Sequence, residues 1–382
     1  MKILVVVPDM LLGGVTSSAI NFCKECRKRG NEVDILVMDG AVSNIPDVNQ
    51  IVLKGPASLW NLSAKQLKNK RLFAKISFAA VASIKKITNH FELWLPIVFH
   101  RYKVHGDYDV ALAFRQCAPC YYFTLKCTKA RTKIGMIHGN LNFMGNTGSW
   151  DKYFPLFNKI ACVSDAVAKD FKEKFRIVAN KFITIYNMFD VEDIHNKASQ
   201  PCLFNVDRSL TNIITVSRHE NNHKRVNRVV EVCAELRKRG VNRFHWYIAG
   251  DGPDFDYNQK LAKDMGVDDL ITFCGSLDNP YALQHQCDFS VITSATEAYS
   301  MSVIESQILK KPIVAMYYPG IEEAIIDGET GLICSQDTNS LCDAILRLIE
   351  KTEFRQDIVK SLNNRPYTND KPYNQLLHAV NS

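Results

Sequence analysis

Short apolar runs alternate with longer segments in which apolar residues recur at helical spacing, from one end of the chain to the other. The first run, Ile3–Val7, is followed by Gly13-Gly14 and by a helical pattern that ends at Gly30. Further strands are predicted at Val33–Met38, Asp109–Phe114, Lys133–Ile137, Lys159–Val163 and Phe182–Tyr186. Alternation of this kind predicts an α/β fold, with a parallel sheet covered by helices.

The alternation restarts after a polar segment, which divides the chain into two halves. Residues 188–211 are rich in Asn, Asp and Ser and contain Pro201, a composition that is typical of a domain boundary. The second half begins with a strand at Asn212–Ser217 and a helix from about Lys224 to Arg239. Its further strands are predicted at Phe244–Ala249, Leu270–Phe273, Phe289–Thr293 and Pro312–Met316.

The predicted architecture is therefore two Rossmann-like parallel-sheet domains that face a cleft. The N-terminal domain is expected over residues 1–190, a linker over 191–211 and the C-terminal domain over 212–355. The tail, 356–382, is expected to return to the N-terminal domain. Ligands of such sheets bind beyond the carboxyl ends of the strands, so residues that directly follow a strand are the candidates for function.

The composition is that of an ordinary globular protein. The chain has 382 residues, 46% hydrophobic and 23% charged, which suits two or three domains with full cores. The first apolar run is too short for the core of a signal peptide, and no uncharged apolar stretch is long enough to cross a membrane. We therefore expect a cytoplasmic protein.

The twelve cysteines include two Cys-x-x-Cys pairs, Cys23/Cys26 and Cys117/Cys120. Cys23 and Cys26 fall within a helical pattern, where residues three apart are neighbours in any case. Cys117 and Cys120 flank Pro119 after a predicted strand. Because cytoplasmic proteins rarely contain disulfides, the favoured interpretation is reduced, mostly buried thiols. A zinc site formed by the two pairs is the alternative.

The net charge of +7 is concentrated in one segment of the chain. Residues 54–105 contain ten basic residues and a single acidic one, Glu92. Between residues 68 and 86 the cations are interleaved with apolar residues, which suits a helix lying in a membrane interface. The hypothesis is peripheral attachment to an anionic membrane surface, the cytoplasmic face of the inner membrane. The alternative is an ordinary surface helix.

Candidate chemistry in the first half follows two of its strands. Gly13 and Gly14 open a helix, and paired glycines there let backbone N–H groups approach a phosphate or a sugar. His138 follows the strand Lys133–Ile137, where an imidazole can donate to a sugar hydroxyl or a phosphate. A tight turn and a structural histidine are the alternatives. The glycine fingerprint of dinucleotide-binding dehydrogenases is absent.

The second half carries two cations and two carboxylates after its strands. Arg218 follows a strand and Lys224 begins the predicted helix, so two fixed cations at a helix N-terminus predict a diphosphate site. Glu297 ends the loop after Phe289–Thr293, and Glu305 lies about two turns into the next helix. A carboxylate at this place is suited to accept hydrogen bonds from a vicinal diol.

Two Asp-x-Asp tripeptides, Asp107/Asp109 and Asp254/Asp256, offer an alternative way to hold phosphates, through a divalent metal. Asp254 and Asp256 are better explained as acids that suit the start of a helix. Since Arg218 and Lys224 already supply positive charge, neither a metal nor another cofactor is expected.

These motifs, in this order, resemble glycosyltransferase family 4, whose members are retaining enzymes with the GT-B fold. The motifs are the Gly13-Gly14 turn, His138, Arg218 with Lys224, Gly250-Asp251-Gly252-Pro253, and Glu297 with Glu305. The later run from Tyr318 to Leu332 is also similar to that family's Gly-x-x-Glu…Asp-Gly-x-x-Gly stretch. Two departures bear on the sugar transferred: Ala298-Tyr299-Ser300 stands where the family has Gly-Phe-Gly, and Ser306-Gln307 follows Glu305 where small residues are usual.

The resemblance implies a role for each candidate residue in binding a nucleotide-sugar donor. Arg218 and Lys224 would bind the donor diphosphate. Glu305 would hold the ribose and Glu297 the transferred sugar, while His138 would contact that sugar or support the reaction centre. The remaining candidates for donor contact, several through the backbone, are Gly13, Gly14, Gly252, Ser300, Met301 and Ser302.

The expected function is retaining transfer of a hexosyl or N-acetylhexosaminyl group from a nucleotide-diphosphate sugar such as a UDP-sugar. The acceptor would be a hydroxyl of a cell-surface polysaccharide, in lipopolysaccharide or capsule, or of a lipid-linked glycan. Fixed cations would stabilise the departing phosphate. The alternatives are a nucleotide-sugar 2-epimerase on the same fold and a non-catalytic nucleotide-sugar-binding subunit. No nucleic-acid partner is expected.

Overall fold

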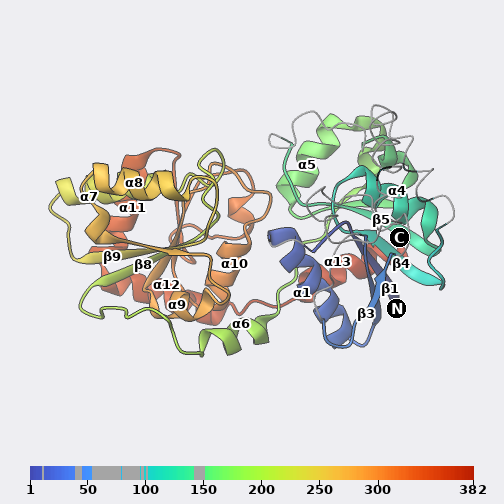
Figure 1. Cartoon of the computed structure of the whole chain (residues 1–382), viewed down its shortest axis with the longest axis horizontal. Helices are drawn as coiled ribbons and strands as arrows, with labels where there is room; N and C mark the ends of the chain where they lie inside the picture. The colour runs from blue at the N-terminus through green and yellow to red at the C-terminus, as the bar shows by residue number, and fades with distance from the viewer. Residues whose placement is uncertain are drawn as a thin grey trace. The chain divides into compact units, whose positions relative to one another are not determined.

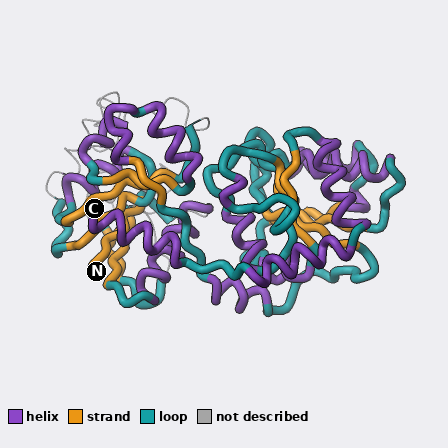
Figure 2. Tube along the Cα trace, turned by 180° about the vertical axis from the view of Figure 1, so that it is seen from behind, coloured by secondary structure: helices purple, strands orange, loops and turns teal. Residues whose placement is uncertain are grey.

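The computed structural model describes residues 1–10, 13–38, 45–53, 79, 95, 99, 102–141 and 151–382. Their contacts divide the chain into two compact units. The first consists of Met1–Phe189 with Asn369–Ser382, and the second of Asp190–Thr368. In each unit the strands lie in the middle and helices pack on either side of them (Figure 1, Figure 2).

The first unit is built on a parallel sheet with strand order β3-β2-β1-β4-β5-β6-β7. Its central strands are buried along nearly their whole length, as parallel strands are when helices cover both faces. The strands are β1 (Lys2–Val7), β2 (Glu32–Val37), β3 (Asn49–Val52), β4 (Tyr108–Ala113), β5 (Ala130–Ile137), β6 (Lys159–Cys162) and β7 (Phe182–Thr184). The described helices are α1 (Gly14–Lys28), α4 (Ala118–Cys127), α5 (Asp165–Lys174) and α13 (Asp370–Asn381), with 3-10 turns at Asp151–Leu156 and Arg176–Lys181.

The second unit contains a parallel sheet with strand order β10-β9-β8-β11-β12-β13. The strands are β8 (Thr211–Val216), β9 (Phe244–Ala249), β10 (Ile271–Gly275), β11 (Phe289–Ile292), β12 (Ile313–Met316) and β13 (Leu332–Cys334). The helices are α6 (Val191–Ala198), α7 (Asn227–Lys238), α8 (Phe255–Asp264), α9 (Tyr281–Gln286), α10 (Met301–Ile308), α11 (Thr338–Glu350) and α12 (Thr352–Asn364). Shorter 3-10 turns lie at Asp268–Leu270 and Ile321–Glu323.

Both sheets reverse their strand order at one place. The chain runs outward from β1 through β2 to β3 and then resumes on the other side of β1 with β4. The second unit does the same around β8, which lies between β9 and β11. Such a reversal is where open α/β sheets bind their ligands, beyond the carboxyl ends of the strands. The candidate site is therefore to be sought in the segments after β1, β4, β8 and β11.

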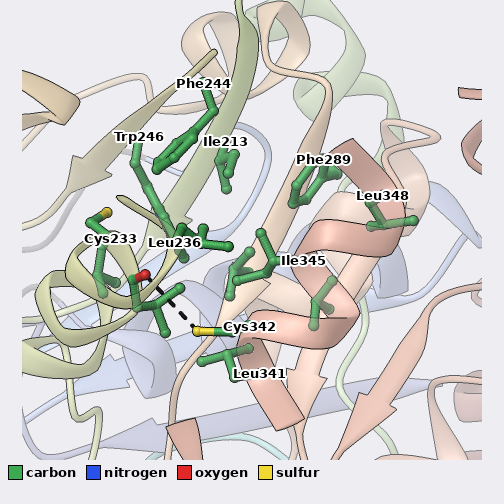
Figure 3. Close-up of a cluster of buried hydrophobic side chains, with 14 of the residues drawn as sticks. Ile213, Cys233, Leu236, Phe244, Trp246, Phe289, Leu341, Cys342, Ile345 and Leu348 are labelled. Atoms are coloured by element: carbon green, nitrogen blue, oxygen red, sulfur yellow. Dashed lines mark hydrogen bonds between the residues drawn. The ribbon is translucent and has the colours of Figure 1, made fainter. Parts of the chain in front are cut away.

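The core of the second unit centres on Trp246 of β9, which is fully buried. Its Nε1 donates to Thr215 Oγ1 at 3.1 Å, and that hydroxyl donates to the Val291 carbonyl at 2.9 Å. These two hydrogen bonds join β9, β8 and β11 inside the core. They also give the buried indole N–H a partner. Figure 3 shows side chains of α7 and α11, among them Leu236 and Ile345, in the same cluster as residues of the sheet. Each such buried side chain contributes about 1.5–3 kcal/mol.

The C-terminal helix α13 belongs to the first unit, although the second unit separates the two in sequence. Leu376, Ala379 and Val380 of this helix are buried in the core of the first unit. At its start, the Asn369 side chain accepts from the Phe189 amide at 2.9 Å and donates to the Phe189 carbonyl at 2.7 Å. The segment predicted as a returning tail at 356–382 thus contains α13, whereas α12 and the residues up to Thr368 are counted with the second unit.

The sequence-based prediction of two parallel-sheet α/β halves is confirmed, and the structure adds elements that the apolar pattern did not indicate. Strand β3 was missed because its residues are mostly half-exposed, and β13 because it is only three residues long. The predicted linker at 191–211 contains α6, whose first turn is capped where Asp190 accepts from the Asp193 amide. The polar composition of this segment had hidden a helix that buries Ile194 and Ala198.

The two Cys-x-x-Cys pairs do not form a disulfide or a shared metal site in the structure. All twelve cysteines are free thiols. Within the described residues, no group of three or more His, Cys, Asp and Glu side chains is placed to hold a metal ion. None of the described helices is both long and apolar enough to span a bilayer.

We predict that Leu376→Ala destabilises the first unit, because the substitution leaves a cavity where α13 enters the core. The expected loss is about 2–5 kcal/mol. Urea unfolding of the full chain, followed by circular dichroism, measures it. Asn374→Ala in the same helix is the matched control, since Asn374 is exposed and should change stability little. Equal midpoints for the two variants would contradict the assignment of α13 to this core.

Candidate active site

The loop after β8, residues 217–226, carries both predicted cations and is fixed by a buried polar network. The His219 ring is fully buried and makes a hydrogen bond through Nδ1 with the Asn258 side chain at 3.1 Å. Burial lowers the pKa of His219, so the neutral ring is favoured. The Asn221 amide donates to Asp254 at 2.6 Å, and its side chain donates to Asn258 at 2.9 Å. Asp254 therefore anchors a loop.

Two glycines after β9 allow close contact between the loops that follow β8 and β9. A Cβ atom at Gly250 would lie 1.9 Å from the Ser217 carbonyl oxygen, and Gly250 has φ 147°. A Cβ atom at Gly252 would lie 2.4 Å from the His219 carbonyl oxygen. Both positions thus exclude a side chain for reasons of packing. The donor contact expected of Gly252 stays a prediction.

An ion pair between Lys224 and Glu297 joins the loop after β8 to the loop after β11. The Lys224 Nζ and Glu297 Oε1 atoms are 2.5 Å apart. Ser294 Oγ donates to the same carboxylate oxygen at 2.7 Å. The backbones are tied as well, since Thr293 Oγ1 donates to the Lys224 carbonyl at 2.7 Å and the Ala295 amide donates to the His223 carbonyl at 2.8 Å. Lys224, expected to bind the diphosphate, and Glu297, expected to bind the sugar, are therefore in direct contact.

The sequence pattern predicted that Lys224 begins a helix, but in the structure Lys224 lies in the loop before it. Helix α7 starts at Asn227, and the chain between them turns through Arg225, which has φ 48°. A non-glycine residue in the left-handed region is uncommon, and it separates Lys224 from the helical backbone. Lys224 is thus positioned by Glu297 and by loop hydrogen bonds.

Arg218 lies in the same loop with a largely exposed side chain. The Arg218 side chain is 66% exposed. Its ion pair with Glu220 is long, at 3.6 Å between Nη1 and Oε2. A guanidinium held so loosely keeps most of its donors available for an anion.

Glu305 lies one turn into α10 instead of two, because the helix begins only at Met301. Its carboxylate accepts a hydrogen bond from the Tyr281 hydroxyl of α9 at 2.9 Å. Burial raises the pKa of Glu305, and the hydrogen bond from Tyr281 opposes that rise. Burial also raises the pKa of Tyr281, whose hydroxyl stays a donor. No sequence motif had pointed to Tyr281.

The start of α10 lies against the carboxyl end of β8. Ser302 Oγ donates to the Val216 carbonyl, the last residue of the strand, at 3.1 Å. Ser300 is the buried residue that precedes the helix. The first turn of α10, Met301 and Ser302, therefore lies beyond the carboxyl end of β8, where a helix N-terminus favours an anion.

A buried arginine and a glutamine support the loop after β11, and sequence reasoning missed both. Arg228 of α7 donates to Gln336 Oε1 at 2.7 Å. The Gln336 side chain in turn donates to the Ser294 carbonyl at 3.0 Å and to the Tyr317 carbonyl at 2.7 Å. Such a long-range relay leaves no short sequence signal, because Arg228 and Gln336 are 108 residues apart.

In the first unit, His138 lies beyond β5 and beside the residues that follow β4. Its amide donates to Gln116 Oε1 at 3.1 Å, and its ring lies 5.0 Å from that of Phe114 between centroids. Burial lowers the pKa of His138 to about 4. Among the described residues, no hydrogen-bond partner faces its buried Nε2 atom. The ring is therefore neutral at physiological pH and has one polar atom available for a ligand.

Gly13 and Gly14 lie where expected, at the start of α1 after β1. A Cβ atom at Gly13 would meet no atom of the described residues within 4 Å. As far as the described residues show, a ligand can approach the backbone at this turn. The basic segment 54–105 lies outside the described residues except for positions 79, 95, 99 and 102–105, and its proposed membrane contact stays a prediction.

A family model matches most of the second unit. Residues 206–365 match the family described as Glycosyl transferases group 1. This range includes Arg218, Lys224, Glu297 and Glu305. The matched range thus contains the whole group of cations and carboxylates around β8 and β11.

Two curated relatives are, by name, a synthase of a glucosaminyl compound and a glycosyltransferase. Over 250 residues, 63% of this chain, the sequence is 26% identical to the N-acetyl-alpha-D-glucosaminyl L-malate synthase of Bacillus anthracis. It is 23% identical over 239 residues to the N-acetylgalactosamine-N,N'-diacetylbacillosaminyl-diphospho-undecaprenol 4-alpha-N-acetylgalactosaminyltransferase of Campylobacter jejuni. The aligned part of this chain spans 65% and 62% of those two relatives.

Among solved structures, the chain resembles a variant of S. aureus TarM in complex with fondaparinux, alpha-GlcNAc-glycerol and UDP. The TM-score is 0.71 at 17% identity, and the match covers 100% of both chains. At this identity the likeness establishes the fold of the whole chain. The chain thus shares the two-domain fold of this solved structure, and its residues 206–365 match the model of the Glycosyl transferases group 1 family.

Proposed function

We propose that this protein is a retaining glycosyltransferase that moves a sugar from a nucleotide-diphosphate donor, a UDP-sugar, to a hydroxyl acceptor. The observation that carries the proposal is the pairing of Lys224 with Glu297 between the loops after β8 and β11. Those two loops flank the strand reversal where a ligand is expected. The UDP held by the S. aureus TarM variant and the family match support a nucleotide sugar as donor.

The donor diphosphate is assigned to Arg218, Lys224 and the first turn of α10. One Lys224 donor is engaged by Glu297, which leaves two ammonium hydrogens for phosphate oxygens. Arg218 brings a second, loosely paired cation. As the glycosidic bond breaks, its electron pair goes to the departing phosphate oxygen, and fixed cations stabilise that charge more in the transition state than in the ground state.

The two carboxylates are assigned to the two ends of the donor. Glu305 accepts from Tyr281 through one oxygen, and its second oxygen is suited to the ribose hydroxyls of the nucleotide. Glu297 is assigned to the hydroxyls of the transferred sugar, beside the ammonium group of Lys224. Retention is ascribed to attack of the acceptor oxygen on the same face from which the phosphate leaves, with a donor phosphate oxygen taking the acceptor's proton.

The first unit is assigned to the acceptor and the sugar. His138 is neutral, so it acts through a hydrogen bond of Nε2 to a sugar hydroxyl and contributes no positive charge. Gly13 and Gly14 would approach the donor through their backbone amides. Their position before α1 supports this assignment, because the first amides of a helix favour an anion.

For the acceptor we favour a lipid-linked glycan or a cell-surface polysaccharide intermediate. The C. jejuni relative acts, by its name, on a diphospho-undecaprenol-linked sugar. Such an acceptor agrees with the proposal that the basic segment 54–105 attaches the protein to the anionic cytoplasmic face of a membrane. The sugar is proposed to be a hexose or an N-acetylhexosamine, and no metal or cofactor is assigned a role.

We expect Arg218→Ala and Lys224→Ala each to reduce turnover about 10²–10³-fold, because each removes a cation that stabilises the leaving phosphate. Arg218→Lys should recover only part of the loss, since an ammonium lacks the planar fork of a guanidinium. Steady-state kinetics with a UDP-sugar and acceptor measures these effects. Arg243→Ala is the matched control, an exposed arginine just before β9 that should leave turnover unchanged. Near-normal turnover in a folded Arg218→Ala or Lys224→Ala variant would remove that residue from catalysis.

Glu305→Gln and Glu297→Gln are expected to differ in kind, although both reduce transfer. Glu305→Gln should weaken binding of UDP about tenfold or more, because it weakens charge-assisted hydrogen bonds to the ribose. Glu297→Gln should spare UDP affinity, since that carboxylate is assigned to the sugar and the Gln Oε1 can still accept a hydrogen bond from Lys224. Isothermal titration calorimetry with UDP alone separates them. Equal UDP affinity in the two variants would contradict the assignment of Glu305 to the ribose and Glu297 to the sugar.

His138 should remain neutral until the solution is strongly acidic. Its pKa in the folded protein is about 4 instead of 6.5. As the pH falls from 6.5 towards 4, His138 therefore binds a proton in the unfolded chain but stays neutral in the folded chain. This ring therefore lowers the stability of the fold progressively from about pH 6.5 to about pH 4. NMR titration should show no protonation of His138 above pH 5.5, with His138→Gln identifying its resonance. A midpoint near 6.5 would refute a buried neutral ring.

A further inference from the structure

Two cysteines three residues apart lie at the start of α4, directly after β4. Cys117 precedes the helix, and Cys120 is its third residue. Pro119 lies between them in the first turn, where a missing N–H costs no helical hydrogen bond. Cys117 is half-buried, whereas Cys120 is fully buried. Cys117 is thus the more exposed residue of the pair.

The surroundings of the two thiols differ. Cys120 Sγ donates a hydrogen bond to the Val6 carbonyl at 3.1 Å. The neighbouring Cys120 side chain, aided by the charge of Arg115, lowers the pKa of Cys117. Burial raises the pKa of Cys120 well above its usual value. Because the thiolate is the nucleophile in disulfide exchange, Cys117 is the member of the pair that reacts first.

The second Cys-x-x-Cys pair of the chain provides an internal contrast. Cys23 and Cys26 are both fully buried and both lie within α1. Burial raises the pKa of Cys23, which has no accessible thiolate. Helical backbone also fixes its two Cβ atoms at about 5–6 Å, beyond the usual distance of about 3.5–4.5 Å in a disulfide. Cys117 is instead in an extended conformation, φ −153° and ψ 149°, so its side chain is not bound to the helical spacing.

We propose that Cys117 and Cys120 form a reversible disulfide, with a small-molecule disulfide as oxidant. The Cys117 thiolate attacks one sulfur of the oxidant, forms a mixed disulfide and releases one reduced thiol. The Cys120 sulfur, after losing its proton, attacks the Cys117 sulfur and releases the second reduced thiol. Two protein thiols are oxidised by two electrons, and the oxidant takes up both electrons and both protons.

The disulfide would form in the turn that contacts His138. Gln116, adjacent to Cys117, accepts from the His138 amide at 3.1 Å. Arg115, one residue earlier, binds Asp9 at 2.9 Å between Nη1 and Oδ2. The redox state of the pair therefore bears on the segment between β4 and α4. This inference is independent of the proposed transferase activity, since the thiol chemistry requires neither donor nor acceptor.

Peptide mapping of the full chain tests the proposal. The folded protein is equilibrated in glutathione buffers of graded oxidation, quenched with acid, denatured and alkylated, and then cleaved with trypsin. The fragment Gln116–Lys126 contains only these two cysteines. It should carry two alkyl groups from reducing buffer and none from oxidising buffer, where it should be lighter than the dithiol by two hydrogen atoms. Dithiothreitol should restore it. Two alkylated thiols in every buffer would overturn the proposal.

Variants test the order of the two steps. Cys120→Ser should stop at a glutathione adduct on Cys117, whereas Cys117→Ser should leave the buried Cys120 unmodified. Cys23→Ser is the matched control and should not alter oxidation of the Gln116–Lys126 fragment. Circular dichroism verifies that each variant is folded. Adduct formation on Cys120 as fast as on Cys117, or a Cys23–Cys26 disulfide formed as readily as the proposed one, would overturn the inference.

Discussion

The ion pair between Lys224 and Glu297 is the interaction on which the arrangement of the candidate site depends. Each charge is partly withdrawn from water, with exposed side-chain fractions of 31% and 14%. A partly buried charge is costly unless it is paired, so each of these residues stabilises the position of the other. Because the two come from loops after β8 and β11, the pair also fixes the two loops to one another at the strand reversal.

Most of the support around this pair is polar, and it is provided by residues outside the family motifs. The loop after β8 is held by hydrogen bonds among His219, Asn221 and Asn258. The loop after β11 is held by Gln336, which accepts from Arg228. Loops have no backbone ladder of their own, so their geometry depends on such hydrogen bonds. In the proposed reaction, a cation held in this way would be oriented before the donor binds, which would reduce the reorganisation needed in the transition state.

The candidate groups of the first unit are of a different kind. His138 is neutral, and a Cβ atom at Gly13 would meet no described atom within 4 Å, so these groups are suited to hydrogen bonding and shape more than to charge. The segment between β4 and α4 connects His138 to Cys117 through Gln116. Burial and electrostatics together distinguish the two thiols of that turn, because Cys120 is fully buried while Cys117 is only half-buried and has a lowered pKa. Burial thus keeps the imidazole neutral and the Cys120 thiol protonated.

The sequence by itself determined the fold class, and the order of motifs named the candidate residues. Fully buried parallel strands leave continuous apolar runs, which is why Phe244–Ala249 was predicted with the bounds the structure gives. Half-exposed β3 and the polar segment of α6 left no such signal. Only the tertiary structure decided that Lys224 meets Glu297, 73 residues away, and that Tyr281 meets Glu305. Periodicity records which face of an element is buried, whereas side-chain partners depend on how distant loops come together in space.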